Sequence, residues 1–108
     1  PEAKTSAIHR AALKQATDAD TALTNLFTGR PARGIVNRLM REIGPMSTFA
    51  PAFPTAGGAL APLRAKTEPT GSGDFINLWS GQAGRLATED SAEAITRRIA
   101  AQALERLT

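Results

Sequence analysis

The chain is short, at 108 residues, and carries a small positive charge of +3, from 13 Lys and Arg against 10 Asp and Glu. It contains no cysteine, which excludes disulfides, thiolate catalysis and cysteine-ligated metals. Because acidic and basic residues are interspersed and no apolar run approaches the roughly 20 residues that span a bilayer, we expect neither a nucleic-acid nor a membrane partner.

The first predicted element is a helix over residues 6–16, in which Ser6 can accept hydrogen bonds from the first N–H groups and apolar residues recur on one face. The ten residues at the start lack the apolar core of a secretory signal, so we expect a cytoplasmic protein. Residues 21–27, TALTNLF, fit both a short strand and a helix, and their threonines favour the strand.

The next predicted helix covers residues 34–43, where Ile35, Leu39 and Ile43 form one stripe. Gly44 and Pro45 are expected to end it, because glycine adopts the left-handed cap conformation and proline cannot continue the hydrogen-bond ladder.

Residues 45–55 carry three prolines and two phenylalanines, which predicts an ordered apolar loop. The following stretch, AGGALAPLRAK, indicates a helix that is interrupted by Pro62 or begins there, and TEPTGSG indicates a surface turn. Asp74 then opens DFINLWSGQAGRLA as an expected N-cap.

The strongest helix pattern is the last, DSAEAITRRIAAQALERL, in which Asp90 and Glu93 have capping-box spacing. Its apolar residues form one stripe, which includes Ile95, Ile99 and Leu107.

The composition points to a segment that packs on something larger. Hydrophobic residues make up 42% of the chain, but 21 of its residues are alanine, which buries little area. With seven prolines and nine glycines as well, the chain is typical of helices laid against another body.

The run LFTGRPARGIVNRLM, residues 26–40, collects arginines that could clamp a phosphate, because the guanidinium binds oxyanions in a planar bidentate geometry. The alternative is structural: Arg30 and Arg33 flank Pro31 at a helix start, while Arg38 and Arg41 lie on a polar helix face. We favour local pairing that fixes the entry of a helix.

The stretch WSGQAG combines Trp79 with two small residues and Gln82, a pattern that permits close backbone approach and one amide contact. The alternative is a buried tryptophan that anchors the segment. His9 is the only histidine and has no evident orienting partner, so we expect no catalytic or metal role for it.

Taken together, LFTGRPARGIVNRLM, APAFPTAGGALAPLRA and GSGDFINLWSGQAGRLA occur in an order that resembles the C-terminal part of nitronate monooxygenases. The opening PEAKTSAIHRAAL resembles the segment after their last barrel strand, so the resemblance covers nearly the whole chain.

The resemblance implies a mainly α chain, the C-terminal helical portion of an α/β (β/α)₈ TIM-barrel flavoenzyme whose main part lies upstream of residue 1. It implies non-covalent FMN, bound mainly outside this chain, and oxidation of alkyl nitronates with O₂ to a carbonyl compound and nitrite. The catalytic histidine of the family would also lie upstream, and His9 does not match it, so no catalytic residue is expected here.

By position, Trp79, Gly81 and Gln82 are the candidates to border the cofactor, and Phe49 and Phe53 are the candidates to line the substrate pocket. The chain has no tyrosine, so no phenol from this segment can contact the nitro group. Two alternatives remain at this point. One is a related barrel flavin reductase that uses NAD(P)H with a quinone or an enoyl thioester. The other is an independent basic helical module that binds an acidic partner.

Overall fold

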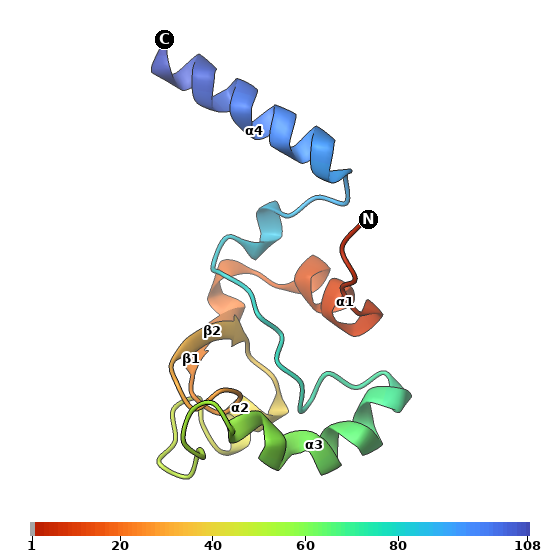
Figure 1. Ribbon diagram of the computed structural model, residues 1–108, viewed down its shortest axis with the longest axis vertical. Helices are drawn as coiled ribbons and strands as arrows, with labels where there is room; N and C mark the ends of the chain where they lie inside the picture. The colour runs from red at the N-terminus through yellow and green to blue at the C-terminus, as the bar shows by residue number, and fades with distance from the viewer. Residues whose placement is uncertain (1) are drawn as a thin grey trace.

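The computed structural model describes residues 2–108 as an elongated arrangement of four α-helices, a two-stranded sheet and three short 3₁₀ turns. One body carries everything except α4, which projects away from it (Figure 1). The prediction of a mainly helical segment is confirmed.

Helix α1 (Ala7–Gln15) forms as predicted, because the Ser6 side chain accepts a hydrogen bond from the backbone N–H of His9 at 3.2 Å. Its inner face covers the first of two small apolar clusters, in which Ile8, Ala12 and Leu13 pack on buried Ala16, Ile35, Ile76 and Leu78. A 3₁₀ turn (Asp18–Asp20) then leads into the sheet.

The sheet is an antiparallel hairpin of β1 (Thr21–Thr24) and β2 (Ala32–Ile35), paired from Thr21 with Ile35 to Thr24 with Ala32. The strand expected within residues 21–27 is therefore confirmed for its first four residues. The helix expected over 34–43 is wrong in its first half, because Gly34 and Ile35 belong to β2.

Helix α2 is correspondingly short (Arg38–Glu42) and begins at Asn37, not at Gly34. The Asn37 side chain accepts from the N–H of Met40 and donates to the carbonyls of Gly73 and Ile76, at 3.0 and 2.8 Å. This buried amide fixes the helix start. The helix ends at Ile43, and Gly44 does not adopt the left-handed conformation expected of it.

Residues 43–55 form an ordered loop, as predicted, and α3 (Ala56–Thr67) follows it. Pro62 neither begins nor interrupts this helix but lies inside it. A 3₁₀ turn (Glu68–Thr70) and a left-handed Gly71 complete the predicted surface turn.

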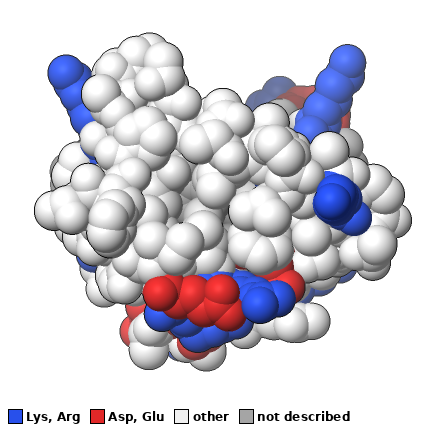
Figure 2. Space-filling view, turned by 90° about the horizontal axis from the view of Figure 1, so that it is seen from below, with Lys and Arg blue, Asp and Glu red and all other residues white. Residues whose placement is uncertain are grey.

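The second apolar cluster lies between α2, α3 and the hairpin. Its buried members are Leu26, Phe27, Leu39 and Met40, with Phe75 and Trp79 packed against them. Viewed from below, the end of the molecule that carries α2, α3 and the loop 43–55 shows a broad uncharged face, with charged side chains gathered mainly along one edge (Figure 2).

The stretch from residue 74 to 91 contains only one 3₁₀ turn (Gly84–Leu86), so Asp74 is not the N-cap that we expected. Helix α4 (Ala92–Leu107) forms as predicted, but its N-cap is Ser91 and not Asp90. Asp90 instead pairs with Arg98 at 2.6 Å, and none of the α4 residues is buried.

Candidate functional site

Residues 78–80 run beside β2 and are joined to it by an isolated β-bridge. Trp79 forms an antiparallel bridge with Gly34, the N–H of Ile35 donates to the Leu78 carbonyl at 2.8 Å, and the N–H of Ser80 donates to the Arg33 carbonyl at 3.4 Å. A side chain at Gly34 would lie 3.1 Å from the Leu78 carbonyl oxygen, which explains the glycine. The hairpin therefore determines where the WSGQ stretch lies.

The Trp79 side chain is half-buried and acts as an anchor. Its ring meets the ring of Phe27 edge to face, with centroids 5.7 Å apart and planes at 84°. On the other side, His9 Nε2 lies 2.8 Å from the Trp79 carbonyl oxygen. Because a carbonyl can only accept, Nε2 must carry the hydrogen. Trp79 is thus held between the hairpin and α1.

Gly81 and Gln82 are exposed, immediately after this anchored position. A side chain added to Gly81 would meet nothing within 4 Å in the described part of the chain. Gln82 borders a shallow cavity of about 360 Å³ together with Asp18 and Arg85. The backbone and the amide are therefore accessible to a neighbouring group, as a site at the border of a cofactor requires.

Phe49 and Phe53 extend from the loop 43–55 into solvent, with 88% and 51% of their surface exposed. The loop beneath them is fixed by two hydrogen bonds between Asn25 and Ser47, of 2.8 and 2.9 Å. Ile43 and Met46 of the same loop are also about half exposed. An ordered loop that exposes four large apolar side chains is a surface built for contact.

The two groups of candidates lie at opposite ends of one short segment, Phe27–Arg30. Phe27 contacts Trp79, while Gly29 lies against the backbone of residues 51–53 and Arg30 stacks on the ring of Phe53, 4.5 Å from its centroid. The sequence did not indicate this connection, because it joins residues more than 20 positions apart.

The arginines of the same run divide into two kinds. Arg33 donates to the carbonyl and the hydroxyl of Thr21, at 3.3 and 3.1 Å, and Arg38 pairs with Glu42 at 2.7 Å. Both bind neighbours, as local pairing predicts. Arg33, however, lies in a strand, so it ties the two strands of the hairpin together instead of fixing a helix start. Arg30 has no such polar partner within residues 2–108.

Among the acidic residues, Asp20 has a structural role. Asp20 accepts from the N–H and hydroxyl of Thr17 at 2.7 and 2.9 Å, and the backbone hydrogen bond lowers the pKa of Asp20. Across residues 2–108, no cluster of three His, Asp or Glu side chains could hold a metal ion. Nor is any helix in that range long and apolar enough to cross a bilayer.

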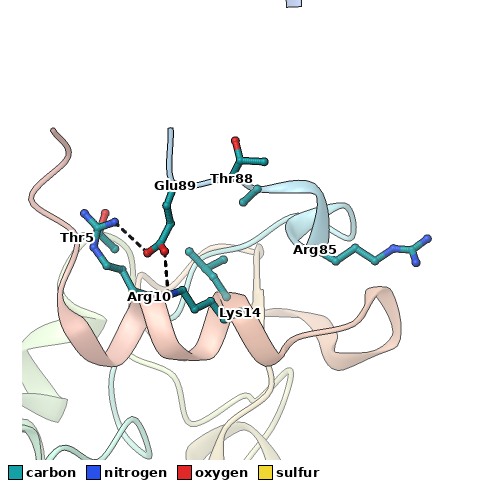
Figure 3. Close-up of a pocket in the computed structure, with 8 residues that line it drawn as sticks. Thr5, Arg10, Lys14, Arg85, Thr88 and Glu89 are labelled. Atoms are coloured by element: carbon teal, nitrogen blue, oxygen red, sulfur yellow. Dashed lines mark ion pairs between the residues drawn. The ribbon is translucent and has the colours of Figure 1, made fainter. Parts of the chain in front are cut away.

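A separate cavity of about 270 Å³ lies where α1 meets the segment before α4 (Figure 3). Glu89 reaches into it and pairs with Lys14 at 2.9 Å and Arg10 at 3.8 Å, while Arg85 points away. These pairs lower the pKa of Glu89, the hydrogen bond from Lys14 being the main cause. The chain's own carboxylate thus occupies this pocket and pairs with two of its basic residues. We therefore assign the pocket to the contact between α1 and the segment before α4, here called the joint, and not to the site.

A family model for nitronate monooxygenase matches residues 1–102. The chain belongs to the nitronate monooxygenase family. A probable nitronate monooxygenase of Staphylococcus saprophyticus is 33% identical over 104 residues, which are 96% of this chain and 29% of that protein. The corresponding protein of Bacillus subtilis is 35% identical over 82% of the chain and 26% of its own length.

A nitroalkane oxidase from Streptomyces ansochromogenes has the same fold over 94% of the chain, with a TM-score of 0.79 and 39% sequence identity. The match covers 29% of that chain. The nitronate monooxygenase segment described here therefore spans less than a third of the length of the relatives it matches, and the family resemblance seen in its sequence is confirmed.

Proposed function

We propose that this chain is the C-terminal segment of an FMN-dependent nitronate monooxygenase that oxidises alkyl nitronates with O₂ to a carbonyl compound and nitrite. The observation that carries the proposal is its similarity, over nearly the whole chain, to a nitroalkane oxidase of known structure. The activity would belong to the complete protein, and the segment alone would be inactive.

Within that protein, residues 1–108 would pack on a TIM barrel formed upstream of residue 1. Two surfaces support this arrangement. The loop 43–55, which exposes Phe49 and Phe53, suits the mouth of the barrel, where active sites of this fold lie. The apolar stripe of α4, with Ile99 and Leu107 exposed by 60% and 83%, suits the barrel wall.

The candidate residues of this chain suit a contact with the edge of FMN and not the pocket that encloses it. Gly81 leaves open space beside the backbone, and the amide of Gln82 is exposed next to it, so both could contact the edge of a planar ring system. The family's flavin supplies the electron transfer when it is bound.

This chain would shape the substrate site and exclude water from it. Phe49 and Phe53 would provide an apolar lining for the alkyl part of the substrate, because their rings are exposed on a fixed loop. Trp79, held by Phe27 and His9, would keep the adjacent Gly81 and Gln82 in place. No side chain of this segment transfers a proton in this scheme.

The test uses the full-length protein. We expect a yellow protein from which FMN can be extracted, which consumes O₂ and releases nitrite when given an alkyl nitronate without any nicotinamide. A flavoprotein that is inactive with nitronates but reduces a quinone or an enoyl thioester with NAD(P)H would overturn the assigned reaction while keeping the family. A protein without flavin would overturn the cofactor as well.

A further inference from the structure

We propose that Arg30 recognises the substrate, by binding the negatively charged nitro group of the nitronate. The inference rests on the proposed function and names the residue that would distinguish an anionic substrate from a neutral one. Arg30 belongs to the TGRPARG run, whose other arginine, Arg33, is used within the hairpin.

The backbone of Arg30 is held in one place. The hydroxyl of Thr28 donates to the Arg30 carbonyl at 2.9 Å and accepts from the Arg30 N–H at 3.2 Å. The preceding Gly29 has a φ of +91° and lies against the backbone of residues 51–53. The turn therefore fixes where the side chain starts.

The side chain is also positioned, but its charge is not used. The guanidinium stacks on the Phe53 ring, 4.5 Å from the centroid, which restricts its motion while leaving its N–H donors at the edge of the stack. Within residues 2–108 it makes no ion pair or side-chain hydrogen bond. By contrast, Arg10, Arg38, Arg64, Arg97 and Arg98 all pair with carboxylates.

The surroundings match a small anion with an apolar tail. A nitronate carries its charge on two oxygens of one planar group, and a guanidinium offers two parallel donors to such a group. The alkyl part would then meet the exposed rings of Phe53 and Phe49. A neutral nitroalkane has no net charge to neutralise, so it would gain much less from Arg30.

The experiment compares Arg30→Gln, Arg30→Lys and Arg41→Gln in the full-length, flavin-loaded protein. Arg41 is an exposed arginine on α2, so Arg41→Gln makes the same change in net charge at a residue that takes no part in the stack of Arg30 on Phe53. We would measure KM and kcat for a nitronate and the inhibition constant of its neutral parent nitroalkane, with flavin content as the check on folding.

We expect Arg30→Gln to raise the nitronate KM by about 10- to 100-fold, the range for loss of hydrogen bonds to a charged group. The inhibition constant of the neutral nitroalkane should change by less than about threefold, and Arg41→Gln should behave as wild type. Arg30→Lys should raise the KM several-fold, because an ammonium keeps the charge without the paired donors.

An unchanged nitronate KM in Arg30→Gln would overturn the inference, and so would an equal loss for the charged and the neutral compound. If Arg30→Gln loses its flavin, Arg30→Lys decides the question: an unchanged KM overturns the assignment and a several-fold rise supports it. If the wild-type protein neither binds nor oxidises nitronates, the proposed function fails and this inference fails with it. If the wild type is active and the Arg30 variants behave like it, only this inference fails and the proposed function stands.

Discussion

At the scale of single residues, Gly29 joins the two halves of the candidate site. It adopts a φ of +91°, and a side chain there would come within 3 Å of the backbone of residues 51–53. The close approach lets the Phe49 and Phe53 loop rest directly on the hairpin connection. Two separate constraints, conformation and space, therefore require glycine at this position.

We predict that Gly29→Ala destabilises the full-length protein by more than about 1–3 kcal/mol, the usual cost of a strained backbone conformation alone. Gly71→Ala is the matched control, because Gly71 has a φ of +81° but open space around it within the described residues. The measurement is urea unfolding of both variants. Equal destabilisation of the two would show that the contact with residues 51–53 contributes nothing.

Arg33 supports a second prediction at this scale. Arg33→Ala removes two hydrogen bonds to Thr21 that join the strands. We expect a loss of stability of about 1–3 kcal/mol and a lower flavin content, with little change in the ranking of substrates. Thermal unfolding, flavin absorbance and KM values for two nitronates would test this. A change in substrate preference at normal flavin content would contradict the structural role.

At the scale of elements, α4 is joined to the body mainly by polar contacts. Glu89 connects the segment before α4 to α1 through Lys14 and Arg10, and Arg98 of α4 reaches back to Asp90. All of these groups are substantially exposed, so salt screens them. The joint therefore orients α4 but contributes little to the stability of the fold.

The joint gives a pH prediction. Because the folded structure lowers the pKa of Glu89, its ion pairs stabilise the joint above the ordinary glutamate pKa of about 4.3 and are lost as the pH falls through the lowered value. Glu89→Gln should speed hydrogen exchange in residues 87–91 at neutral pH, and the difference from wild type should vanish in acid. Glu105→Gln, at the far end of α4, serves as the control. A difference that persists in acid would contradict the mechanism.

The elements also show which parts of the fold can be predicted from the sequence. Helices α1 and α4 were predicted because each carries its own apolar stripe and polar capping residues close to its start, although the cap of α4 is Ser91 and not the expected Asp90. Gly34 and Ile35 of β2 were mistaken for helix because their partners, β1 and residues 78–80, lie outside the local pattern from which the helix was predicted. For the same reason the contact between His9 and Trp79, 70 positions apart, could not be predicted.

At the scale of the whole molecule, the chain leaves much of its apolar surface uncovered. Of the large hydrophobic residues, Phe49, Leu86, Leu104 and Leu107 are exposed by 65% or more. The two clusters inside the body hold only eight buried apolar residues. Such a chain needs a further surface to pack on, in keeping with the large share of its relatives' length that it does not span.

This leads to a prediction for α4 in the complete protein. If its apolar stripe is covered there, Ile99→Asp should lower the free energy of unfolding by at least about 1.5–3 kcal/mol, the value of burying such a side chain. Ala101→Asp introduces the same charge on the opposite face of the helix and should cost much less. Chemical unfolding monitored by circular dichroism measures both, and equal costs would mean that the stripe remains in solvent.

One contact near the ends of the chain has a practical consequence. The Glu2 carboxylate accepts hydrogen bonds from the Ala92 N–H at 3.1 and 3.3 Å, so the point where the chain enters the body adjoins the point where α4 begins (Figure 1). The two ends of the segment 3–91 therefore lie next to each other. A unit with its two ends together can be exchanged between related enzymes at a single junction. Chimeras that swap this segment would separate what it contributes to substrate choice from what the rest of the protein contributes.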